Sequence, residues 1–176
     1  MQSQRLVLQS GTWLPSYRPL QAFQLETADG TPFTLQSLQG RPHLVFFGFT
    51  HCPDICPTTL ALVTSVVARE PLPGLQPVFV SVDPERDDAV TLRRYADAFN
   101  GRFLPVRGSE QALQPLMKSL SAVAAKVPTP DGQYTVDHSA HLYYLDAQGR
   151  LAAVFTPPLD AAGLEADLRR IAAALP

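Results

Sequence analysis

Residues 44–60 read LVFFGFTHCPDICPTTL, and this stretch decides the fold. Its first part, residues 44–49, is short, apolar and rich in aromatic and β-branched side chains, which predicts a strand buried on both faces. Cys52 and Cys56 follow this strand, each next to a proline, and the pattern then changes to helical spacing. The cysteines are therefore expected where a central strand ends and a helix begins, the edge at which open α/β sheets gather their functional groups.

The two cysteines are the only ones in the chain and have the spacing CxxxC. Because Pro57 disfavours helical backbone in the residue before it and suits the first position of a helix, we expect Cys56 at the N-cap and the helix from Pro57 onward. The N–H groups and partial positive charge of a helix N-terminus favour thiolate, which makes a cysteine nucleophilic and a good soft-metal ligand. The alternative is an inert pair, but a bridge across so short a loop would stabilise the fold little.

Length and composition indicate an ordinary soluble globular protein. The chain has 176 residues, of which 45% are hydrophobic and 17% charged, with a net charge of −2. It shows no basic footprint for nucleic acid and no apolar run long enough to span a membrane. Residues 1–11 lack the pattern of a secretory leader, so a signal or anchor is expected to be absent from this chain. We expect residues 1–22 to form an extended segment and residues 23–176 to form a single domain.

Hydrophobic periodicity and turn signals predict the remaining elements. The expected strands lie at 23–25, 33–35, 44–49, 78–82, 103–106, 138–145 and 151–155. Helices are expected from Pro57 onward, after Asp87 or Asp88, after Ser109 and over 164–175. Pro105 inside its strand indicates a sheet edge. The order of hairpin, β-α-β unit, helix, β-hairpin and final helix predicts a thioredoxin-like α/β fold, with a central mixed sheet flanked by helices and an N-terminal hairpin extension.

A candidate site residue lies at the end of the second buried strand, in the sequence SVDPERD at 81–87. Because parallel strands of a β-α-β unit end at the same sheet edge, Asp83 is expected beside the cysteine loop. Two interpretations of Asp83 remain open at this point. It either supports the site or caps the next turn, since Asx turns are common before proline.

A histidine completes the expected site. In a thioredoxin-like sheet the first strand of the late hairpin runs antiparallel to the central strand, so its start meets the central strand's end. His138 is expected to begin that strand and hence to lie beside Cys52 and Cys56. The other histidines are expected elsewhere, with His43 at the opposite end of the central strand, His51 pointing away from Cys52 and His141 on the other face of the late strand.

Two thiolates and one imidazole form a soft, three-coordinate donor set. Such a set suits copper(I) and, with one added ligand, copper(II) or zinc. Thiolate-rich sites select copper(I), and copper(II) binds more strongly than the other divalent ions of its row. A structural zinc site would need a fourth protein ligand, and none is evident nearby in the sequence. Copper in both oxidation states is therefore the predicted metal.

The chain resembles the Sco/SenC family of copper chaperones for cytochrome oxidase assembly. Three motifs carry the resemblance in the family's order and spacing, namely GFTHCPDICP at 48–57, SVDPERD at 81–87 and VDHSA at 136–140. The resemblance implies copper held by Cys52, Cys56 and His138, with Asp83 at an acidic position near the site. It also implies a periplasmic location and a membrane tether in the full-length protein, through a helix that this chain lacks.

Three functions use the same residues. The first is an assembly factor that passes copper to the CuA site of a cytochrome c oxidase subunit, with another copper carrier as a further partner. The second is a thiol-disulfide oxidoreductase that reduces the cysteines of the oxidase subunit or of another copper protein, with Cys52 attacking and Cys56 resolving. The third, peroxide reduction by Cys52 alone, has no further signature in the sequence. The sequence does not rank the first two.

Overall fold

The computed structural model describes residues 6–51 and 55–175. The strands are β1 (Gly11–Arg18), β2 (Gln24–Thr27), β3 (Pro32–Thr34), β4 (His43–Gly48), β5 (Gln76–Ser81), β6 (Leu104–Arg107), β7 (Ala124–Pro128), β8 (Tyr134–His138), β9 (Leu142–Leu145) and β10 (Leu151–Phe155). The helices are the short 3-10 helix η1 (Leu35–Leu38), α1 (Ile55–Val67), α2 (Ala89–Asp97), α3 (Glu110–Leu120) and α4 (Ala161–Ala174). Among the described residues, no helix has the length and apolar character needed to cross a membrane.

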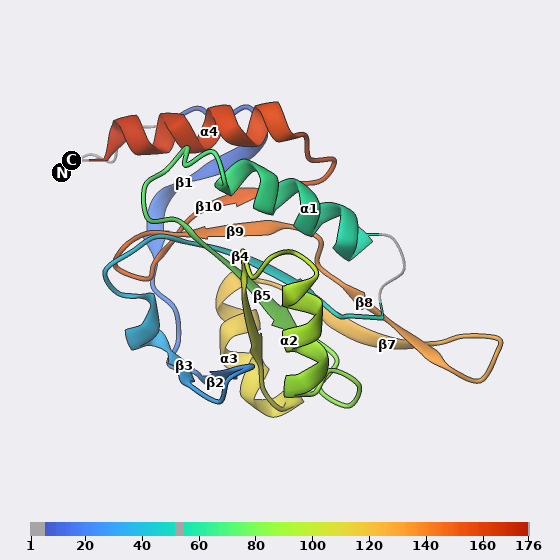
Figure 1. The fold of residues 1–176 in the computed structure, drawn as a ribbon. Helices are drawn as coiled ribbons and strands as arrows, with labels where there is room; N and C mark the ends of the chain where they lie inside the picture. The colour runs from blue at the N-terminus through green and yellow to red at the C-terminus, as the bar shows by residue number, and fades with distance from the viewer. Residues whose placement is uncertain (1–5, 52–54, 176) are drawn as a thin grey trace.

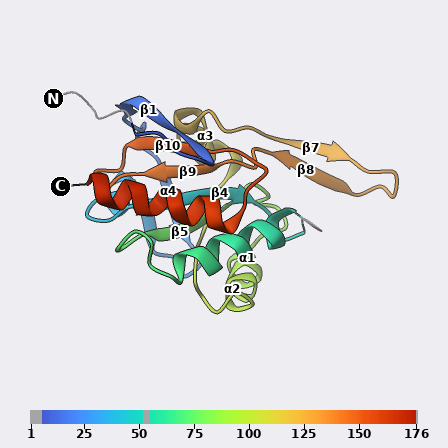
Figure 2. The same ribbon diagram turned by 90° about the horizontal axis from the view of Figure 1, so that it is seen from above.

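Eight strands form one mixed sheet in the order β1-β10-β9-β4-β5-β6-β2-β3. Figure 1 shows α1 and α4 side by side over one face, with α2 and α3 on the other side. Strands β7 and β8 form a separate two-stranded sheet, here called the ribbon, which projects beyond the main sheet in both ribbon views (Figures 1 and 2). The expected thioredoxin-like arrangement of a mixed sheet flanked by helices is confirmed.

The central strand β4 has the surroundings that its apolar sequence predicts. All six of its residues are buried, because α1 and α4 cover one face of the sheet and the other face packs against further apolar side chains. It pairs in parallel with β5, where Val45 is opposite Val78, and antiparallel with β9, where Val45 is opposite Tyr143. The predicted β-α-β unit and the antiparallel return of the late hairpin are therefore confirmed.

The N-terminal strands extend the main sheet at both of its ends. Strands β2 and β3 form the predicted hairpin, with Leu25 opposite Phe33 and Gly30 at a positive φ of 81° in the turn. The segment that we expected to be extended contains β1, which pairs with β10 as an edge strand. The buried carboxylate of Asp167 on α4 accepts the N–H groups of Gln9 and Ser10 at 2.7 and 2.6 Å, which fixes the entry to β1.

The expectation of a sheet edge at Pro105 is wrong, because β6 lies between β5 and β2. The carbonyl of Pro105 accepts the N–H of Ala28, so the missing N–H of Pro105 faces the β2 side. Strand β2 pairs with β6 only at the next two residues, Val106 and Arg107. The missing N–H of Pro105 therefore lies at the end of the paired residues of β2, where no hydrogen bond between β2 and β6 is lost.

His43, the first residue of β4, should make stability depend on pH. It is only 2% exposed, and burial, with a smaller effect of the Arg41 charge, lowers its pKa to about 4. The folded protein then keeps His43 neutral while the unfolded chain binds a proton below about pH 6.5. This contribution is complete above pH 6.5 and is lost as the pH falls toward 4, by about 3 kcal/mol in total.

The variant His43→Leu should lack this part of the pH dependence. Denaturant unfolding of both proteins at pH 7 and pH 4 measures it, since the difference between them cancels the carboxylate titrations that they share. Parallel pH profiles for the two proteins would show that His43 is not held neutral by burial.

Candidate metal centre

Three segments meet at the carboxyl edge of the sheet. Strand β4 ends at Gly48 and leads into the loop before α1. Strand β5 ends at Ser81 and leads toward Asp83 and Asp87, and β8 ends at His138.

Cys52 lies outside the described residues. Of Cys56 the structure describes only the backbone position, in the first turn of α1. The placement of the two sulfur atoms therefore stays a prediction.

The expected start of this helix at Pro57, with Cys56 as N-cap, is wrong by two residues, because α1 begins at Ile55. Proline is tolerated here because the first N–H groups of a helix have no acceptor within it, so Pro57 in the third position breaks no hydrogen bond. Cys56 still belongs to the N-terminal turn of α1, where the positive end of the helix favours thiolate. The physical argument for a reactive cysteine is unchanged.

His138 lies beside the end of β4, as predicted, although the strand that carries it differs. It ends β8, whereas β9 begins at Leu142, so the expected single strand from 138 to 145 is wrong. The strand is divided because residues up to His138 pair with β7 and those from Leu142 onward pair with β4. The imidazole packs edge-on against Phe49, with ring centroids 5.8 Å apart and planes at 90°.

The hydrogen bonding of His138 determines which nitrogen carries a lone pair. Its Nδ1 lies 3.1 Å from the backbone carbonyl oxygen of Ser139. A carbonyl can only accept, so Nδ1 donates, and in the neutral ring the lone pair is on Nε2. Ligating histidines are commonly oriented in this way, through a backbone acceptor on the second nitrogen. The half-buried ring therefore has the tautomer that a metal ligand needs.

Asp87 fixes the loop after β4, a role that its position in the sequence does not reveal. The sequence allows either Asp87 or Asp88 as the helix cap, but Asp88 alone caps α2, accepting the N–H of Thr91 at 2.8 Å. The fully buried carboxylate of Asp87 instead accepts the N–H and hydroxyl of Thr50, at 3.0 and 2.6 Å, and the hydroxyl of Ser81 at 2.7 Å. It thereby ties the loop after β4 to the end of β5. The sequence shows only that a second aspartate is present in SVDPERD.

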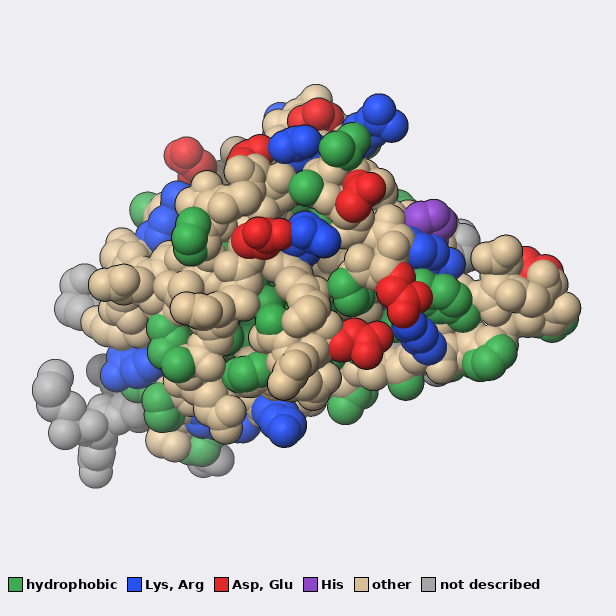
Figure 3. Space-filling model, turned by 90° about the horizontal axis from the view of Figure 1, so that it is seen from below, with side chains coloured by type: hydrophobic (Ala, Val, Ile, Leu, Met, Phe, Trp, Pro, Cys, Tyr) green, Lys and Arg blue, Asp and Glu red, His purple; other side chains and the backbone are tan. Residues whose placement is uncertain are grey.

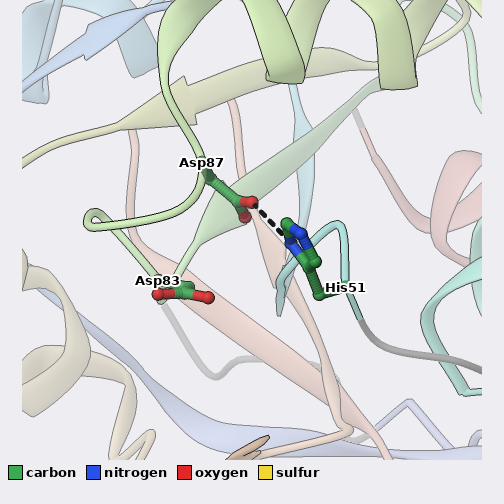
Figure 4. Close-up of side chains that lie close together, drawn as sticks. All are labelled: His51, Asp83 and Asp87. Carbon is green, nitrogen blue, oxygen red and sulfur yellow. Dashed lines mark ion pairs between the residues drawn. The ribbon is translucent and has the colours of Figure 1, made fainter. Parts of the chain in front are cut away.

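His51 is directed toward this carboxylate, as Figure 4 shows. Its Nδ1 lies 3.8 Å from Oδ1 of Asp87, and its side chain is 52% exposed. His51, Asp83 and Asp87 offer ligand atoms within 4.8 Å of one another. The oxygens of Asp87 already accept three hydrogen bonds, however, and those of Asp83 accept two from side chains. We therefore interpret this cluster as support for the loop.

Asp83 has contacts that argue against turn capping by its side chain. The turn is closed by its backbone carbonyl, which accepts the N–H of Asp87 at 2.9 Å. The fully buried carboxylate accepts Nε–H of Arg86 at 2.5 Å and the hydroxyl of Tyr134 at 2.8 Å. Asp83 thus links the segment after β5 to strand β8, which also carries His138.

Comparison with known proteins identifies a close set of relatives. The family model described as SCO1/SenC matches residues 15–173. A protein of Stutzerimonas stutzeri is 34% identical over 161 residues, which are 90% of this chain and 79% of that protein. The chain spans only 47% to 66% of the length of the mitochondrial and rickettsial SCO2-type relatives.

Solved structures have the same fold. Bradyrhizobium japonicum ScoI with copper bound has a TM-score of 0.76 and 38% identity, over 86% of this chain and 98% of that one. BsSco, described as a member of the Sco family of cytochrome c oxidase assembly proteins with a disulfide switch, has a TM-score of 0.71 over 92% and 97% of the two chains. At 23% identity, the likeness to BsSco shows the fold alone.

Proposed function

This chain belongs to the SCO1/SenC family, and from this premise we propose that it binds copper through Cys52, Cys56 and His138 and delivers it to the CuA site of cytochrome c oxidase. The observation that carries the proposal is the position of His138. Its imidazole lies against Phe49, three residues before Cys52, and its Nδ1 is engaged by the Ser139 carbonyl. The neutral imidazole thus offers Nε2 as a donor beside Phe49, in the segment that leads into the cysteine motif.

The chemistry of the donor set supports copper as the cargo. Two thiolates satisfy copper(I), and the imidazole adds the nitrogen donor that copper(II) favours. The N-terminal turn of α1, which contains Cys56, favours the thiolate form on which both ions depend. The copper-bound relative from Bradyrhizobium japonicum, at 38% identity, supports the same assignment. The partner would be the CuA-bearing oxidase subunit, and we place this exchange in the periplasm by family resemblance.

The edge of the main sheet suits transfer between proteins. His51, in the loop before α1, has a side chain that is 52% exposed, and His138 is half-buried. On the face of the molecule in Figure 3, acidic and basic side chains are intermixed and do not gather into a patch of one sign. A ligand exchange at the metal is the expected route of transfer.

A second candidate function is thiol-disulfide exchange. It is favoured by one observation, that Cys56 lies in the N-terminal turn of a helix that directly follows the central strand of a thioredoxin-like sheet. There the thiolate of Cys52 would attack a disulfide of the oxidase subunit or of another copper protein, and Cys56 would resolve the mixed disulfide. The two substrate cysteines would be reduced while Cys52 and Cys56 are oxidised to a disulfide.

An anaerobic copper titration tests the proposal. Reduced protein should bind one equivalent of copper, whereas protein oxidised at the cysteine pair should bind none, because a disulfide has no thiolate to donate. Equal stoichiometry for both forms would refute the assignment.

Incubating reduced, copper-free protein with a disulfide-oxidised CuA domain tests the second function. Appearance of free thiols on that domain would support exchange.

A further inference from the structure

The ribbon that carries His138 has limited support from the rest of the fold. Within the described part of the chain, β8 pairs with β7 and with no other strand. Figures 1 and 2 show that the ribbon projects away from the main sheet. Its position relative to the end of β4 therefore depends on side-chain contacts, which include those along one face of β8 and the ion pairs of Lys126 on β7 with Glu85 and Glu110.

The residues of that face are Tyr134, Val136 and His138, since alternate residues of a strand share a face. Val136 is 5% exposed and packs in the core. The rings of Phe46 and Phe49 flank His138. Tyr134, nearest the tip of the ribbon, contacts the segment that follows β5. The three side chains together attach β8 to the body of the protein.

Tyr134 contacts three residues of SVDPERD, namely Asp83, Arg86 and Glu85, and its hydroxyl lies 3.4 Å from Oε2 of Glu85. Its hydroxyl donates to Oδ1 of Asp83 at 2.8 Å, and Cζ of Arg86 lies 3.8 Å from its ring centroid. Nε–H of Arg86 donates to the other carboxylate oxygen of Asp83 at 2.5 Å. Tyr134, Asp83 and Arg86 thus form a closed triangle, here called the Tyr134 clamp. Each side is a charge-assisted hydrogen bond or a cation–π contact.

The clamp is also connected to the metal loop through Arg86. Cζ of Arg86 lies 5.8 Å from the ring centroid of Phe49, the same ring that packs edge-on against His138. Nη2 of Arg86 is buried and has no hydrogen-bond partner among the described residues. The orientation of this guanidinium therefore rests on Asp83 and the two aromatic rings. A displaced Tyr134 would disturb His138 both along β8 and through Arg86 and Phe49.

We infer that Tyr134, Asp83 and Arg86 are positioning residues that hold the imidazole of His138 at the metal centre. This inference rests on the proposed copper function. None of the three needs to touch the metal. Because copper(II) depends on the nitrogen donor more than copper(I) does, the clamp makes copper(II) binding, and with it the preference between the two ions, sensitive to residues that are not ligands.

Two variants of Tyr134 and a control on the same strand test the clamp. Tyr134→Leu removes the ring and the hydroxyl, whereas Tyr134→Phe removes only the hydroxyl bond to Asp83. Thr135→Val is the matched control, because Thr135 lies on the opposite face of β8. We expect Tyr134→Leu to lower copper(II) affinity by about ten- to hundredfold, the usual cost of losing a ligand's support, with copper(I) affinity nearly unchanged. Tyr134→Phe and Asp83→Asn should show smaller losses of the same selectivity.

Hydrogen exchange of the copper-free protein gives an independent measurement. The N–H of Ser139 donates to the Val123 carbonyl at the base of the ribbon. Its exchange should be faster in Tyr134→Leu than in the wild type and in Thr135→Val. Unchanged exchange together with unchanged copper(II) affinity would overturn the inference, and so would an equal loss of both copper ions. If wild-type protein bound no copper, the proposed function would fail, while the exchange result would still decide whether the clamp holds the ribbon.

Should Tyr134→Leu fail to fold, Tyr134→Phe and Arg86→Lys provide the same comparison with smaller perturbations. Lysine keeps the charge but lacks the planar guanidinium that stacks on Tyr134 and donates to Asp83. We expect Arg86→Lys to weaken copper(II) selectively. Wild-type affinity for copper(II) in both of these variants would also overturn the inference.

Discussion

Protein with both cysteines replaced, Cys52→Ala/Cys56→Ala, should bind no copper(I) in competition with a chelator and should show no thiol-disulfide exchange. Only His138 of the proposed ligands would remain, and a single imidazole lacks the thiolates that select copper(I). This is the largest effect that we expect. Copper retained at full stoichiometry by the double variant would place the site elsewhere in the chain.

The two single variants sharpen this experiment. Cys52→Ala and Cys56→Ala each leave one thiolate and the imidazole, so weakened copper binding should persist in both, whereas turnover of a disulfide substrate should be lost in both. Circular dichroism and thermal unfolding serve as the control for folding. Neither cysteine should be needed for the core, because β4 is buried by apolar contacts with its neighbours.

Replacing the imidazole should separate the two candidate functions. In His138→Ala, copper(II) loses its nitrogen donor, and its affinity should fall by more than the roughly hundredfold that loss of a ligand's support costs. Copper(I), which two sulfur atoms satisfy, should be affected much less. Thiol-disulfide exchange should largely survive, since it needs only the cysteine pair. Copper(II) titration followed by absorption spectra, alongside an exchange assay on the same sample, measures the separation.

His141→Ala is the matched control for this variant. His141 lies three residues further along the chain, and its ring packs beside Tyr143 at a centroid distance of 6.3 Å. It should keep wild-type copper(II) affinity. If His138→Ala also kept the wild-type affinity and spectrum, His138 would not be a ligand, and the copper function would rest on the cysteine motif alone.

Local patterns predict a large share of this fold. The apolar run before the cysteine motif predicts the buried central strand, and Asp88 and Ser109 are the caps of α2 and α3. Such features depend on neighbours within a few residues, whose backbone preferences and capping groups are visible in the sequence. The position of His138 beside the end of β4 was also predicted, because the order of elements leaves few ways to return to the central strand.

The tertiary structure decided which distant segments pair. It shows that β6 is an interior strand despite Pro105, and that residues 134–138 pair with β7 before the chain joins β9. A backbone N–H or C=O can pair with any strand, so the sequence alone does not select the partner. The choice depends on how the apolar faces pack, and that is a property of the whole chain.

The same distinction applies to the site. The amino-acid sequence by itself determined the cysteine motif, its place after a buried strand and the presence of three acidic groups in SVDPERD. Only the tertiary structure decided that Asp87 holds Thr50 and that Asp83 and Arg86 hold Tyr134. The physical reason is that buried carboxylates must find donors, and those donors come from whichever segments the packing brings near, however far apart they lie in the chain.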